Sequence, residues 1–166
     1  MTLWGSQATV IVTALSIYQT SYGGSPTLNK TIQYIMEFTL NMQVIITVVY
    51  WSVLHEWLMN IIADKPILIF INIWIHILPF VVMAINVGLS KIRFKYERWT
   101  VTGVTSCVFM VFNFAGVKIL GEPLYPFLTW NDFQSIINAV ALFAFVIASY
   151  FFTTFLVNKL TLYPIS

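Results

Sequence analysis

Long apolar runs alternate along this chain with short segments that carry glycine, proline, asparagine or charge. Residues 67–88 contain no charged side chain, and as a helix they reach about 33 Å, enough to cross a hydrocarbon core about 30 Å thick. The pattern predicts an all-α fold, a polytopic transmembrane helix bundle of about five spans that forms a single transmembrane domain over residues 1–166. The predicted spans are residues 2–20, 32–54, 67–88, 99–119 and 133–157.

Composition agrees with this pattern and excludes a soluble domain. Hydrophobic residues make up 59% of the chain and charged residues 8%, and the mean hydropathy is +0.85. The single cysteine, Cys107, excludes an internal disulfide and a cysteine-based metal site. Because the sequence has no HExxH motif and no glycine-rich phosphate loop, we expect no metal, no cofactor and no nucleic-acid partner.

Basic residues are unevenly divided between the two sides of the membrane that these spans would create. Lys65 and Lys118 fall on one side, and the remaining basic residues fall on the other. The positive-inside rule therefore predicts that loop 89–98 and the C-terminal tail face the cytoplasm, or the matrix if the membrane is mitochondrial. The residues of the basic side are Lys30, Lys91, Arg93, Lys95, Arg98 and Lys159.

One histidine lies inside the apolar run 67–88. His76 is about 14 Å from the start of this predicted span, near the middle of the bilayer, where a polar side chain needs a partner or a cavity. Asn72 lies one turn earlier on the same face, and Pro79 is expected to loosen the turn around His76. Two interpretations remain open: a packing histidine that bonds between helices, or a general base that deprotonates a hydroxyl nucleophile.

Such a nucleophile would come from a neighbouring span, and the candidates are Thr2, Thr39 and Ser52. Depth favours Thr39, which lies about 12 Å from the cytoplasmic end of span 32–54. The alternative for Thr39 is a hydrogen bond within its own helix. Glu37, the acidic residue inside an apolar run, is either a functional carboxylate or a side chain that reaches the interface.

Several short motifs follow one another in a fixed order. They are VVYWSVLHEW at residues 48–57, His-x-x-Pro at His76–Pro79, a basic loop, and Tyr-Pro-Phe-Leu at Tyr125–Leu128. Together they resemble the androgen-induced family of multipass membrane hydrolases, which cleave fatty acid esters of hydroxy fatty acids with a threonine and a histidine. MTLWGSQATVIVTAL resembles the family's second span, so the resemblance implies that Thr2 is the nucleophile and His76 the base.

The same alignment implies that the family's first span is missing: either the given sequence lacks an N-terminal span, or this family member has lost catalysis. Two hypotheses follow. The first is a lipid ester hydrolase of an endomembrane or the plasma membrane, with membrane lipids as its partners. The second is a non-catalytic structural subunit of a larger membrane protein complex, with the mitochondrial inner membrane as a candidate location. A small transporter has less support, because only Glu37 and His76 could serve an ion path.

Overall fold

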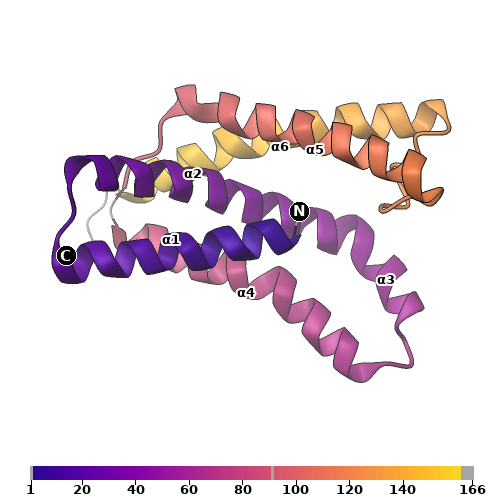
Figure 1. Cartoon of the computed structure of the whole chain (residues 1–166), viewed down its shortest axis with the longest axis horizontal. Helices are drawn as coiled ribbons and strands as arrows, with labels where there is room; N and C mark the ends of the chain where they lie inside the picture. Colours follow the sequence, from indigo (N-terminus) through magenta and orange to yellow (C-terminus); the bar gives the residue numbers. More distant parts are fainter. Residues whose placement is uncertain (1, 91, 162–166) are drawn as a thin grey trace. The chain divides into compact units, whose positions relative to one another are not determined.

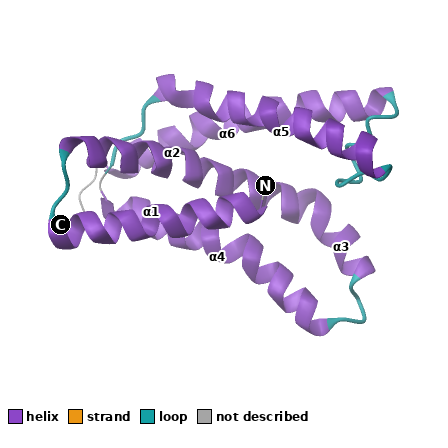
Figure 2. Ribbon diagram, in the orientation of Figure 1, coloured by secondary structure: helices purple, strands orange, loops and turns teal. Residues whose placement is uncertain are grey.

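The computed structural model describes residues 2–90 and 92–161, and every regular element in these residues is a helix (Figure 1, Figure 2). A helix lies at each predicted span, which confirms the all-α fold. A π-helix, Tyr50–Leu54, joins α2 to α3, and a 3₁₀-helix, Tyr96–Arg98, precedes α5. The α-helices are α1 (Thr2–Tyr22), α2 (Pro26–Val49), α3 (His55–Ile61), α4 (Pro66–Ser90), α5 (Trp99–Leu120) and α6 (Phe133–Thr161).

Four helical segments among the described residues are long and apolar enough to cross a membrane. They are Pro26–Ile61, Pro66–Ser90, Tyr96–Leu120 and Phe133–Leu160. The chain is therefore an integral membrane protein with several spanning helices. Helix α1 is 21 residues long but is not among the four, because glycine, glutamine, serine and threonine dilute its apolar residues. Its crossing of a membrane stays a prediction.

The second helical segment is longer than the predicted span 32–54. It begins at Pro26, where the hydroxyl of Ser25 caps the helix by accepting from the Leu28 backbone N–H at 3.1 Å. It then continues without a break through the π-helix and ends at Ile61. The apolar run alone did not show that polar residues on both sides of it are also helical.

The chain divides into two compact units: Met1–Lys95 with Thr153–Ser166, and Tyr96–Phe152. In the first unit α1 and α4 run parallel, and α2 packs antiparallel to both (Figure 1). Apolar residues from these helices, from the segment after α4 and from the end of α6 form one core. Its buried members are Val12, Ile32, Met36, Leu40, Met83, Val87, Phe94 and Val157.

Hydrogen bonds between side chains and backbone close one end of the first unit. The amide of Gln33 donates to the Arg93 carbonyl at 2.7 Å. The side chain of Asn158 accepts from the Phe94 N–H at 2.8 Å and donates to the Phe94 carbonyl at 2.9 Å. These bonds join the start of α2, the segment after α4 and the end of α6. Four residues of the predicted basic side lie on these segments: Lys30, Arg93, Lys95 and Lys159. Lys91 lies outside the described residues.

The second unit contains α5, the first part of α6 and the connection between them. Leu128, the last residue of the Tyr-Pro-Phe-Leu motif, is fully buried, and its N–H donates to the Tyr125 carbonyl at 3.0 Å. Burial also raises the pKa of the Tyr125 phenol. Asp132 then caps α6 by accepting from the Ser135 N–H at 2.6 Å. In this unit the Tyr-Pro-Phe-Leu motif therefore forms a turn whose last side chain, Leu128, is buried.

Candidate active site

Small and polar side chains line the face of α1 that packs against α2. A Cβ atom placed on Gly5 would lie 2.7 Å from Ile46 Cδ1 and 2.9 Å from Gln43 Nε2, so the two helices approach closely there. The same Gln43 amide donates to the Thr9 hydroxyl at 3.0 Å. Small residues and side-chain hydrogen bonds are the usual means by which membrane helices associate. Gly5 and Thr9, two of the residues that dilute α1, are therefore buried between the helices.

A polar contact between α1 and α4 sets the register of these two helices. Asn86 Nδ2 donates to Thr13 Oγ1 at 3.4 Å. The helices run parallel, so moving back about eleven residues on α1 and about ten on α4, roughly 15–17 Å in each case, leads to Thr2 and His76. These two residues meet: Thr2 Oγ1 lies 3.3 Å from His76 Nε2. The structure thus brings together the two residues that the family resemblance assigned to catalysis.

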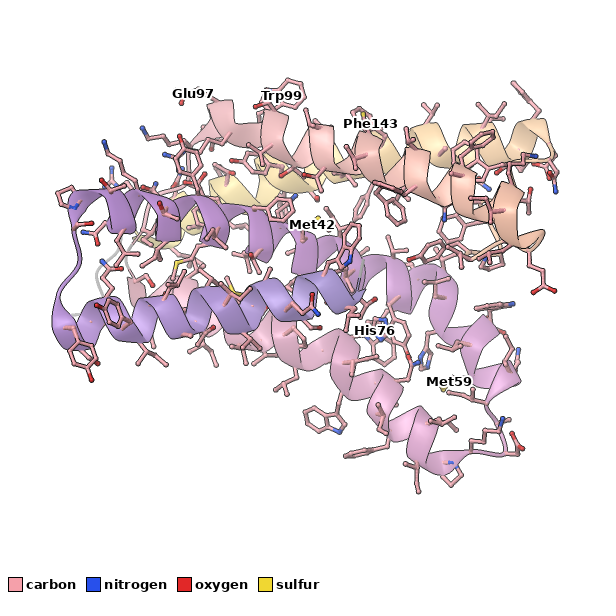
Figure 3. The ribbon with its side chains drawn as sticks, in the orientation of Figure 1. Met42, Met59, His76, Glu97, Trp99 and Phe143 are labelled. Carbon is pink, nitrogen blue, oxygen red and sulfur yellow. The ribbon has the colours of Figure 1, made fainter. Side chains whose placement is uncertain are left out.

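The other ring nitrogen of His76 fixes the tautomer. Nδ1 lies 2.7 Å from the backbone carbonyl of Asn72, one turn earlier on α4. A carbonyl only accepts, so Nδ1 carries the proton in the neutral ring and Nε2 presents a lone pair. The Thr2 hydroxyl therefore donates to Nε2. Figure 3 shows His76 on α4, near the start of α1. Its side chain is only 7% exposed.

Residues at the end of α2 and in the π-helix that follows it contact the backbone carbonyl and the ring of His76. Thr47 Oγ1 donates to the His76 carbonyl at 2.9 Å. The ring of Tyr50 stacks on the imidazole, with ring centroids 3.7 Å apart and an angle of 7° between the ring planes. Pro79, three residues further along α4, lies inside the helix as predicted and has no N–H to donate to the preceding turn. The imidazole is thus held by its own helix on one side and by α2 on the other.

The other candidate nucleophiles do not have this geometry. Thr39 is fully buried, but its Oγ1 has no hydrogen-bond partner, either within its own helix or outside it. Helix α2 instead reaches the level of His76 at Thr47, about eight residues or 12 Å further on. The depth estimate that favoured Thr39 was wrong, because it counted from span ends and could not include the offset between α2 and α4. Ser52 lies exposed in the π-helix.

Glu37 is buried, so the interpretation that its side chain reaches the surface is wrong. Its Oε1 accepts from Gln33 Nε2 at 3.0 Å, and the same nitrogen donates to the Arg93 carbonyl. This places the carboxylate toward the basic end of the unit, about ten residues or 15 Å along α2 from Thr47. Glu37 therefore does not belong to the cluster around His76.

In the described part of the chain, no group of three or more His, Cys, Asp and Glu side chains is placed to hold a metal ion. Fold and site together define an all-α integral membrane protein in which a part-buried threonine hydroxyl meets a buried histidine. No family model, curated protein or solved structure matches the chain. Membership of the androgen-induced family therefore stays a prediction that rests on the motifs.

The close approach at Gly5 gives a direct test of this packing. Gly5→Leu is expected to destabilise the first unit by about 1–3 kcal/mol, because the new side chain meets Ile46 and Gln43, and Gln43 cannot move without breaking its bond to Thr9. Thermal unfolding in detergent measures the effect. Gly88→Leu is the matched control, since a Cβ on Gly88 meets nothing within 4 Å. Equal unfolding temperatures for the two variants would contradict the helix contact.

Proposed function

We propose that the protein is a lipid ester hydrolase in which Thr2 is the nucleophile and His76 is the general base. One observation carries the proposal: the Thr2 hydroxyl lies 3.3 Å from the His76 nitrogen that has a free lone pair. A threonine hydroxyl is a weak nucleophile until a neighbouring base takes its proton. The Asn72 carbonyl orients the imidazole in the way that a carboxylate does in hydrolase triads.

These groups and water account for every bond and proton in the reaction. Thr2 Oγ1 attacks the carbonyl carbon of the ester while its proton passes to His76 Nε2. The bond to the alcohol oxygen then breaks, and that oxygen leaves with the proton from His76. A water molecule next gives a proton to Nε2 and attacks the acyl-threonine carbon. This step releases the fatty acid, and the proton returns from His76 to the Thr2 oxygen.

An apolar ester dissolved in the bilayer is the substrate class that fits the surroundings of His76. The neighbouring residues of α4, Trp74, Ile75 and Leu78, are apolar and exposed, as expected for a helix surface that faces lipid. The motif resemblance adds fatty acid esters of hydroxy fatty acids as the substrate and an endomembrane or the plasma membrane as the location.

Labelling with a long-chain alkyl fluorophosphonate tests the proposal. Such a probe forms a covalent bond with an activated serine or threonine hydroxyl. The purified, folded protein is expected to take up one phosphonate, and fragment-ion mass spectrometry should locate it on Thr2 within the peptide that ends at Lys30. Folded protein that neither labels nor cleaves a fatty acid ester would refute the hydrolase and leave the non-catalytic subunit as the remaining hypothesis.

A further inference from the structure

A second ring system lies behind His76 and has no part in the reaction described above. Tyr50 is almost fully buried, with 1% of its surface exposed, and its ring lies flat against the imidazole. Aromatic rings packed in this way resist rotation, because turning the imidazole about its bond to Cβ would drive its edge into the neighbouring ring. The direction in which Nε2 points is therefore coupled to the position of Tyr50.

Tyr50 is itself held by a histidine. Its hydroxyl shares a hydrogen bond with His55 Nδ1 at 3.1 Å, and the two rings meet edge to face with centroids 5.4 Å apart. Trp51 covers the other part of the His55 ring, at 4.4 Å between centroids. His55 thus fixes the hydroxyl end of Tyr50, while the ring of Tyr50 rests on His76.

The backbone between these residues explains how they meet. In a regular α-helix, residues five positions apart point about 140° away from each other around the axis. The segment Tyr50–Leu54 is instead a π-helix, in which the His55 N–H donates to the Tyr50 carbonyl. This wider turn returns the fifth residue to the side of the first. Single π-turns inside α-helices occur frequently at functional sites.

We infer that Tyr50 is a positioning residue for His76, and that the π-helix serves to fix Tyr50 through His55. The inference rests on the proposed hydrolase, because it assigns Tyr50 the task of keeping Nε2 directed at Thr2. It adds a second layer to the site: the Asn72 carbonyl sets the tautomer of His76, and the stacked Tyr50 ring sets the plane of its imidazole.

Labelling rates of substituted proteins test the inference. Tyr50→Leu removes the stacked ring and is expected to slow fluorophosphonate labelling about tenfold or more. Tyr50→Phe removes the hydrogen bond alone, whereas His55→Ala removes the bond together with the ring contacts of His55. Each should slow labelling roughly two- to tenfold. Once His55 is replaced, the Tyr50 hydroxyl has lost its bond to Nδ1, so the double variant should be no slower than His55→Ala. Tyr22→Leu, at an exposed tyrosine on α1, is the control and should label normally.

A second readout does not depend on catalysis. The chain has only two histidines, so nitrogen NMR of protein labelled at histidine resolves both rings, and His55→Ala assigns them. His76 should show one tautomer with the proton on Nδ1. Tyr50→Leu should convert it to an average of both tautomers, because an imidazole free to rotate loses its bond to the Asn72 carbonyl. If wild-type protein never labels but the tautomer of His76 changes in Tyr50→Leu, the proposed hydrolase function is refuted and the positioning role of Tyr50 stands. Wild-type labelling rate and an unchanged His76 spectrum in Tyr50→Leu would overturn the inference.

Discussion

His76→Ala is expected to slow both fluorophosphonate labelling and ester cleavage by about 10²- to 10⁴-fold, the usual contribution of a general base. Without the imidazole, the Thr2 proton has no acceptor at 3.3 Å, and the hydroxyl returns to its weak intrinsic reactivity. The fold should survive, because one interhelical hydrogen bond in a membrane protein contributes only about 0.6 kcal/mol on average. Labelling kinetics together with thermal unfolding in detergent measure the two effects separately.

A matched control separates the loss of a base from the loss of a helix contact. Asn86→Ala removes a second hydrogen bond between α1 and α4, to Thr13, and leaves His76 in place. It should label at close to the wild-type rate with a similar change in stability. Added imidazole should partly restore labelling of His76→Ala, because it can occupy the space of the lost ring. Normal labelling of His76→Ala would show that this histidine has only a packing role.

The helices could be predicted from the sequence because their apolar runs are long and their connections carry strong breakers. The residues at which the helices begin and end were harder to predict. The π-helix at Tyr50–Leu54 has no composition signal, since its residues would fit an ordinary α-helix equally well. The spanning role of α1 is also undecided by sequence, because hydroxyl and amide groups lower its hydropathy although Thr9 and Thr13 among them bond to neighbouring helices.

The candidate site was only partly accessible from the sequence. His76 could be identified because a histidine in the middle of an apolar run needs a partner. Thr2 came only from the motif resemblance, and the estimated depth along the spans favoured Thr39 instead. Thr47 and Tyr50 were missed altogether, since a threonine and a tyrosine are ordinary residues in a membrane span. Finding them requires the rotation and offset of α2 against α4, and these depend on contacts between distant residues such as Gly5 and Ile46.

Separate substitutions of Thr2 and Thr39 are the most direct test of which threonine lies beside His76. Thr2→Val keeps the shape of the side chain but removes the hydroxyl, so labelling should disappear, with a loss of at least the 10²- to 10⁴-fold expected for the base. Thr2→Ser keeps a hydroxyl on the same atom and should still label. Mass spectrometry of each labelled protein identifies the modified residue.

Thr39→Val should raise the stability of the protein and leave its labelling unchanged. The Thr39 hydroxyl is buried without a hydrogen-bond partner, and burying such a group costs about 1–3 kcal/mol. Valine has nearly the same shape and no polar group to desolvate, so Thr39→Val should raise the unfolding temperature. If Thr39→Val abolishes labelling while Thr2→Val preserves it, Thr39 is the residue that meets His76, and the parallel register of α1 and α4 is wrong at that level.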